Sequence, residues 1–201
     1  MKQSTWVLIG LAVLFLMYGG CKYNGMVGTD QNVNGKWANV QSEYQRRNDL
    51  IGNLVETVKG EANFEKGVLE SVIQARASAS QMKVDATNLT PEKIKEFQAA
   101  QGMIGSAMSR LLSVTEAYPN LKSNAAFADL RVQLEGTENR VKVARNDYNN
   151  AVQAYNVHTK TFPSNIFAGM FGFKEKGFFQ AEQGAEKAPS LKGAFDTKPT
   201  Q

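Results

Sequence analysis

Residues 33–58 read VNGKWANVQSEYQRRNDLIGNLVETV and contain a regular repeat of apolar side chains. These side chains recur at alternating steps of three and four residues, which places them on one face of an α-helix. That face consists of Val33, Trp37, Val40, Tyr44, Arg47, Ile51, Leu54 and Val58. The pattern predicts a long amphipathic helix whose apolar face carries one cation, Arg47.

Three later stretches keep the same spacing. The second stripe is Val68, Val72, Ala75, Ala79 and Met82. The third is Ile94, Phe97, Gln101, Ile104, Met108, Leu111, Thr115 and Tyr118. The fourth is Phe127, Leu130, Leu134, Thr137, Val141, Ala144, Tyr148, Ala151, Tyr155, His158 and Phe162. A repeat of seven kept over this length is typical of left-handed coiled-coil packing.

We therefore expect an all-α fold, an antiparallel up-down four-helix bundle spanning residues 23–162. Its helices are expected at about 30–59, 62–84, 91–118 and 123–162. Thr90-Pro91-Glu92 has the features of a helix start, and Gly60 those of a stop.

Residues 1–22 predict a membrane anchor. From Gln3 to Cys21 there is no charged residue, and the centre, Trp6 to Tyr18, is almost wholly apolar. A spanning helix needs about 20 mostly apolar residues, and Trp6 and Tyr18 stand where interfacial aromatic residues are common. We expect an N-terminal transmembrane helix in a bacterial membrane. Two alternatives stay open: a lipoprotein anchored through Cys21 after Gly19-Gly20, and a cleaved signal peptide.

Residues 163–201 divide into an aromatic segment and, from about residue 180, a tail expected to be flexible. An even number of antiparallel helices returns the chain to the end of the bundle where the anchor begins. The aromatic segment is therefore a candidate membrane-facing surface. Its members are Ile166, Phe167, Met170, Phe171, Phe173, Phe178 and Phe179. The alternative is that these rings cap the open end of the bundle.

The run from Tyr44 to Gly60, YQRRNDLIGNLVETVKG, is the longest of several motifs, which include Phe162-Pro163-Ser164-Asn165-Ile166. These motifs resemble those of the LemA family of bacterial membrane-associated proteins. The resemblance covers nearly the whole chain. It implies a single N-terminal hydrophobic segment, a four-helix bundle and no established enzymatic activity. Two positions depart from the family pattern, since Gly52 replaces its usual proline and Phe64 its common histidine.

The residue types that usually carry chemistry are scarce. His158 is the single histidine and Cys21 the single cysteine, so we expect no metal site, no cofactor and no catalytic group. The 23 basic residues are interleaved with 19 acidic ones, a distribution that disfavours nucleic acid as a partner.

A charge on the apolar face of a helix is costly unless it is paired. Arg47 therefore predicts partners at its own height in the bundle. The expected polar layer comprises Arg47, Glu70, Gln101, Thr137 and Glu138, with Glu135 as an alternative to Glu138. Such a layer fixes the register of the helices or serves as a docking site.

The preferred functional interpretation is a non-enzymatic, membrane-tethered helical scaffold or adaptor, whose partners are the lipid bilayer and an unidentified protein of the bacterial cell envelope. Two alternatives come from other classes: a metal-dependent enzyme that uses carboxylates in the bundle, and direct lipid binding through the phenylalanine-rich segment.

Overall fold

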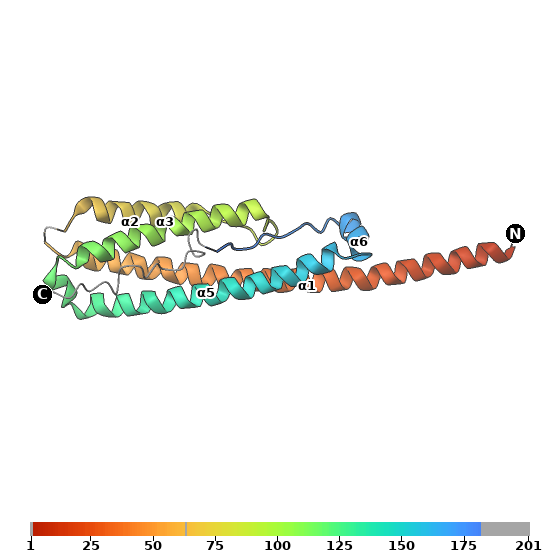
Figure 1. The fold of residues 1–201 in the computed structure, drawn as a ribbon, viewed down its shortest axis with the longest axis horizontal. Coiled ribbons are helices and arrows are strands. Elements are labelled where there is room, and N and C mark those ends of the chain that lie inside the picture. The colour runs from red at the N-terminus through yellow and green to blue at the C-terminus, as the bar shows by residue number, and fades with distance from the viewer. Residues whose placement is uncertain (1, 63, 182–201) are drawn as a thin grey trace, which may run out of the picture.

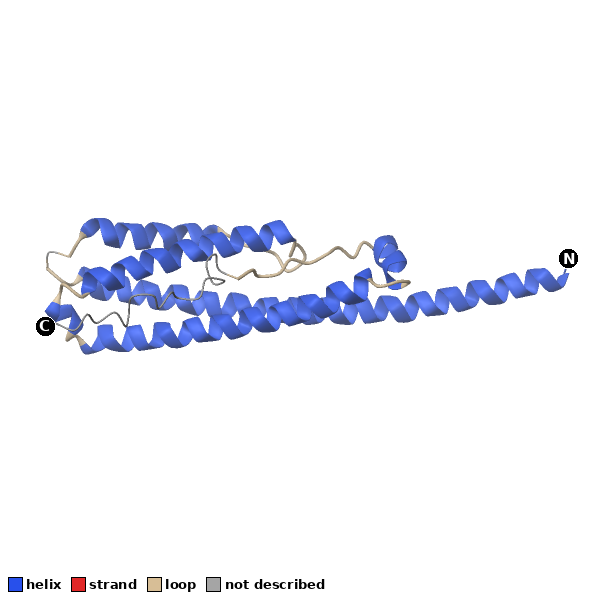
Figure 2. Cartoon of the chain, viewed as in Figure 1, coloured by secondary structure: helices blue, strands red, loops and turns tan. Residues whose placement is uncertain are grey.

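A computed structural model describes residues 2–62 and 64–181 of the chain. Within these ranges the chain forms helices and turns, with no strand (Figure 2). The helices are α1 (Lys2–Lys59), α2 (Lys66–Gln81), α3 (Pro91–Thr115), α4 (Pro119–Lys122), α5 (Ala125–Lys160) and α6 (Ser164–Phe171). The expected all-α class is confirmed.

Four of these helices, α1, α2, α3 and α5, lie alongside one another, and neighbours in the sequence run in opposite directions (Figure 1). We use "helical body" for α2, α3 and α5 together with residues 26–59 of α1. The N-terminal part of α1 extends beyond the other long helices, and α6 lies beside α1 near the point where it leaves them (Figure 1).

The core of the helical body is built from the apolar stripes. On α1 the stripe from Val33 to Val58 is buried along its whole length, with Val33, Trp37, Leu54 and Val58 at 0% exposure. Each such side chain contributes roughly 1.5–3 kcal/mol through removal from water. An aromatic group, Trp37, Phe97 and Tyr148, fills the middle of the body, with Trp37 5.2 Å from Phe97 and 5.5 Å from Tyr148 between ring centroids.

The first helix is longer than the sequence pattern predicted. We expected an anchor over 1–22 and a separate helix from about residue 30, but α1 is continuous from Lys2 to Lys59. Its glycines lower helix propensity by about 1 kcal/mol each without ending the helix. Two of them are close-approach positions. A Cβ at Gly19 would lie 2.9 Å from the Phe167 ring, and one at Gly25 would lie 2.8 Å from the His158 ring.

The other helix ends follow local chemistry. α2 stops at Gln81 instead of about residue 84, and the carbonyl of buried Val84 accepts the indole N–H of Trp37 at 3.2 Å. α3 begins at Pro91, where the Thr90 side chain accepts from the N–H of Lys93. It ends at Thr115, short of the expected residue 118. The N-cap of α5 is Asn124, whose side chain accepts from two backbone N–H groups.

Within the described part of the chain, we find no helix that is both long and apolar enough to cross a membrane. The tail expected to be flexible falls mainly on residues 182–201, which lie outside the described residues.

Candidate functional site

The structure brings Arg47, Gln101 and Glu138 together inside the helical body. Arg47 is 5% exposed, and its Nη1 lies 3.2 Å from Oε1 of Glu138 on α5. Its Nη2 donates to the backbone carbonyl of Gln101 on α3 at 2.9 Å, and its guanidinium lies 5.4 Å from the Tyr44 ring centroid. The carboxylate of Glu138 is half-exposed, so this ion pair joins the core to the surface.

Two other expected members of the polar layer have different partners. Thr137 is fully buried, but its hydroxyl donates to the carbonyl of Gln133 and accepts from Arg140. Glu70 lies outside the layer, because its exposed side chain pairs with Lys66 at 3.6 Å. Val68 and Val72 are turned into the core, and successive residues of a helix rotate by about 100°, which directs Glu70 outward. The alternative partner, Glu135, is exposed.

A second polar contact beside this layer was missed by the sequence analysis. Arg76 on α2 donates from Nε to the backbone carbonyl of Asn48 at 3.0 Å. Its guanidinium lies over Gly52, where a Cβ would be 3.0 Å from Nη2. The glycine that departs from the family pattern therefore makes room for an arginine from the neighbouring helix.

The candidate membrane-facing segment divides into exposed and buried residues. On α6, Ile166, Met170 and Phe171 are 50%, 68% and 49% exposed, and Phe162 just before it is 80% exposed. Phe167 is buried against α1, with its ring 6.0 Å from that of Tyr18. The outer side of α6 is thus an apolar surface beside the projecting part of α1.

The end of the segment lies in the core, which the sequence analysis did not predict. Phe179 is 5% exposed, and its ring lies 5.4 Å from Tyr148, 6.2 Å from Trp37 and 6.3 Å from Phe97. Phe178 beside it is 41% exposed, as expected for neighbours in an extended chain. Phe173 is partly buried, 5.9 Å from Tyr23.

We call residues 173–181 the strap. It is an extended segment that runs back along the helical body after α6, seen in Figure 1 as the blue trace between α6 and α3. An extended chain outside a sheet has no ladder to satisfy its peptide groups. Side chains of the body supply the partners instead. Asn156 exchanges two hydrogen bonds with the backbone of Lys176, and Asn149 exchanges two with Phe179.

Two tyrosines of α5 also donate hydrogen bonds to the strap. Tyr155 donates to the carbonyl of Lys174 at 2.9 Å, and Tyr148 donates to that of Gly177 at 3.0 Å. Burial raises the pKa of the Tyr148 phenol above its usual range, and burial together with Asp30 raises the pKa of Tyr155 to about 12. Both phenols are therefore protonated at neutral pH and available as donors.

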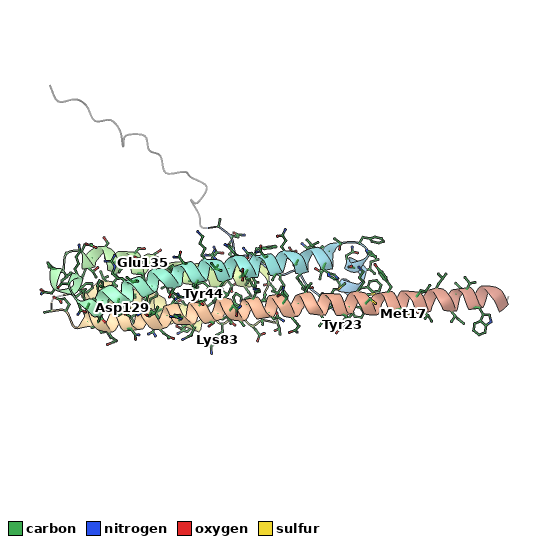
Figure 3. All side chains as sticks on the ribbon, turned by 90° about the horizontal axis from the view of Figure 1, so that it is seen from below. Met17, Tyr23, Tyr44, Lys83, Asp129 and Glu135 are labelled. Carbon is green, nitrogen blue, oxygen red and sulfur yellow. The ribbon has the colours of Figure 1, made fainter. Side chains whose placement is uncertain are left out.

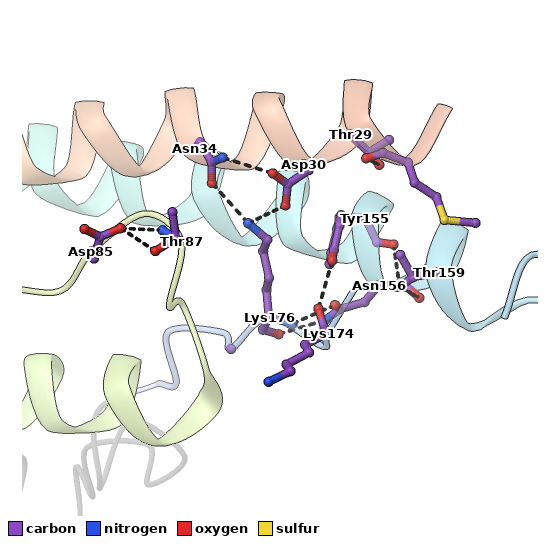
Figure 4. Close-up of polar contacts among 12 residues, drawn as sticks. Thr29, Asp30, Asn34, Asp85, Thr87, Tyr155, Asn156, Thr159, Lys174 and Lys176 are labelled. Atoms are coloured by element: carbon purple, nitrogen blue, oxygen red, sulfur yellow. Dashed lines mark hydrogen bonds and ion pairs between the residues drawn. The ribbon is translucent and has the colours of Figure 1, made fainter. Parts of the chain in front are cut away.

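The strap also inserts a cation into the body. Lys176 is 8% exposed, and its Nζ lies 2.8 Å from Oδ1 of Asp30 and donates to Asn34 at 3.0 Å (Figure 4). The same ammonium lies 5.1 Å from the Tyr155 ring centroid. A buried ammonium is costly unless it is paired in this way.

A signal for this arrangement was present in the sequence. The dipeptide Tyr-Asn occurs at 148–149 and again at 155–156, seven residues later. Only the tyrosines fit the apolar stripe, and the asparagine that follows each of them is the sequence signal for the strap.

Two more residues that the sequence analysis considered, Cys21 and His158, lie on α1 and α5. Cys21 is a free, exposed thiol on α1. His158 packs against Gly25, and its Nε2 is buried without a hydrogen-bond partner. Among the described residues, no group of three histidine, cysteine, aspartate or glutamate side chains is placed to hold a metal ion.

A double-mutant cycle tests the ion pair of Arg47. Glu138→Gln should lower the free energy of unfolding by about 1 kcal/mol, a modest value because the carboxylate is half-exposed. Arg47→Met, which removes a buried charge and keeps an apolar chain of similar length, should be nearly neutral. Urea unfolding of both single variants and the double variant measures the coupling. Equal costs of Glu138→Gln with and without Arg47 would show that the pair contributes nothing.

Docking of the strap is tested by Asn149→Asp. The carboxylate of the variant still accepts from the N–H of Phe179, but it cannot donate to the carbonyl of Phe179. The strap should therefore be released more often. We expect trypsin to cleave after Lys174 and Lys176 several times faster than in the unmodified protein. Asn150→Asp is the matched control, because this neighbour is exposed and makes the same charge change. Equal cleavage rates in the two variants would contradict the assignment.

The chain is similar in sequence to magnetosome proteins and to a LemA protein. The chain is 28% identical over 176 residues to magnetosome protein MamQ 1 of Paramagnetospirillum magneticum, covering 79% of this chain and 65% of the relative. It is 24% identical over 193 residues to magnetosome protein MamQ of Magnetospirillum gryphiswaldense, covering 88% and 70%. Protein LemA of Metamycoplasma hominis is 22% identical over 176 residues, covering 88% and 76%. The chain thus spans slightly less than two thirds of the Paramagnetospirillum protein.

The family profile that matches is that of the LemA family, over residues 36–192. This range begins just before Trp37 and includes α2 to α6 and the strap, and it amounts to more than half of the chain. The chain therefore belongs to the LemA family.

Proposed function

We propose that this protein is a non-enzymatic scaffold or adaptor, an up-down four-helix bundle held at a bacterial membrane by the projecting part of α1. The observation that carries the proposal is the exposure of that helix. Its large apolar side chains between Trp6 and Met17 are from 49% to 74% exposed where the structure describes them. Soluble surfaces rarely keep so large a continuous apolar area in water.

The length of the projection supports the same proposal. Residues 2–17, which precede the contacts of Tyr18 and Gly19 with Phe167, extend over about 24 Å, enough to reach through most of the roughly 30 Å hydrocarbon core of a bilayer. Met17 lies on this projecting part, beyond the helices that surround the rest of α1 (Figure 3). The helical body would then stand out from the membrane surface, with its flanks and far end free to meet a protein partner.

A second candidate function, direct lipid contact, is favoured by the outer side of α6. Phe162, Ile166, Met170 and Phe171 are exposed beside the projecting helix, and the Phe171 ring lies 4.9 Å from that of Tyr23. An anchored helical body would hold these side chains at the level of the lipid headgroups. The same surface would fix the tilt of the body relative to the bilayer.

The anchor is tested with Leu8→Asp combined with Leu11→Asp in the full chain. A carboxylate at the centre of a membrane helix costs about 2.5–3.5 kcal/mol. Flotation with phospholipid vesicles should therefore show a loss of membrane binding of at least about tenfold. Val132→Asp with Val143→Asp is the control, because these exposed valines lie on α5, away from the projection. Unchanged flotation of the Leu8 and Leu11 variant would refute the anchor.

The position of α6 is tested by fluorescence. In a Trp6→Phe background, a tryptophan introduced by Phe171→Trp should be quenched by nitroxide lipids labelled near the headgroup, whereas buried Trp37 contributes a constant signal. Val143→Trp in the same background is the control on the flank of the body. If the two introduced tryptophans are quenched to the same extent, α6 does not contact lipid.

A further inference from the structure

Side chains that line the groove bind the strap through hydrogen bonds to the strap's backbone. The pattern of these bonds repeats along α5. Tyr155 and Asn156 bond to residues 174 and 176, and Tyr148 and Asn149 bond to residues 177 and 179. The body residues are seven positions apart and the strap residues three. Seven helical residues advance about 10.5 Å and three extended residues about 10 Å. One pattern of recognition is therefore repeated along α5.

Bonds from two other parts of the body add to this register. The N–H of Gly177 donates to the carbonyl of Leu89 at 2.8 Å, in the connection before α3. Gln98 on α3 exchanges two hydrogen bonds with the backbone of Gln180, at 2.9 and 3.0 Å. Three side-chain amides thus each pair with both the N–H and the carbonyl of one strap residue. Such pairing fixes an extended peptide whatever its side chains are.

Side-chain specificity comes from three positions. The cation of Lys176 is held by Asp30 and Asn34, and the ring of Phe179 enters the aromatic group around Trp37. Gly177 leaves no room for a side chain, because a Cβ there would lie 2.5 Å from Cα of Pro91. Phe178, by contrast, is 41% exposed. The groove therefore selects the sequence Lys-Gly-x-Phe, in which x is unrestricted.

We propose that this groove is a peptide-binding site for an extended Lys-Gly-x-Phe segment, and that its occupant in trans is the strap of a second copy of this chain. Each copy carries the segment to which the groove is complementary. The hydrogen bonds described above join strap to body without depending on the covalent connection, so a strap from a neighbour makes the same bonds. Gly172, at φ 78°, is the turn between α6 and the strap.

In a single chain the strap competes with any incoming segment. A tethered segment has an effective concentration on the order of 1 mM, which favours the closed form in dilute solution. Exchange between copies then grows with protein concentration, and it yields paired chains without creating any new contact.

The first experiment uses the full chain in detergent micelles. Gly177→Val should expel the chain's own strap, because its side chain meets Pro91. A fluorescent peptide with the sequence of residues 173–181 should then bind this variant at least about tenfold more tightly than the unmodified chain, whose tethered strap competes. Phe178→Ala is the control that keeps its strap seated. The proposal would be overturned if the peptide bound Gly177→Val no more tightly than the unmodified chain. It would also be overturned if a peptide with valine in place of its glycine bound equally well.

The second experiment keeps the amide pairs of Asn149 and Asn156 and gives up only that of Gln98, so it decides the matter if Gly177→Val does not fold. A chain carrying Gln98→Cys is mixed at high concentration with one carrying Gln180→Cys, both with Cys21→Ser. Exchange should produce a disulfide-linked dimer of the two chain types under mild oxidation. Ser106→Cys, exposed further along α3, replaces Gln98→Cys in the control. Dimer formation no faster than in this control would show that straps do not exchange.

Discussion

The pairing of an extended backbone by side chains is the interaction on which the middle of this molecule depends. Without the strap, Trp37, Phe97 and Tyr148 would face a groove, and the ring of Phe179 closes it. That ring stays in place only if the peptide groups on either side of it are satisfied. The side chain of asparagine offers both a donor and an acceptor. It can therefore pair with the N–H and the carbonyl of one extended residue, which has no neighbouring strand to bond to in a helical protein.

Much of the fold could be predicted from the sequence, because a helix that packs on one side must repeat its apolar residues at a fixed spacing. The stripe from Val33 to Val58 is buried as that spacing requires, and Arg47 within it has a charged partner on another helix. Glu70 was wrongly assigned to the polar layer. Counting residues along a helix gives the position of a residue along the helix axis, but not the side of the helix from which its side chain points. The neighbours of Glu70, Val68 and Val72, already indicated that it faces outward.

The strap could not be predicted in the same way. Its nine residues have neither the spacing of a helix nor the alternation of a strand, and their partners come from α1, α3, α5 and the connection before α3. The high phenylalanine content of the C-terminal segment suggested contact with lipid. Phenylalanine content alone does not distinguish a membrane-facing surface from a protein core. The structure leaves the outer side of α6 exposed and buries Phe179 in the core.

Hydrogen exchange of the strap amides measures whether the strap is held by its backbone. The N–H groups of Lys176, Gly177, Phe179 and Gln180 each donate within the groove, whereas that of Phe178 makes none of these bonds. We predict that the four bonded amides exchange far more slowly than that of Phe178 in the full chain at neutral pH. Uniformly fast exchange from residue 174 to residue 180 would show that the strap is not held by its backbone.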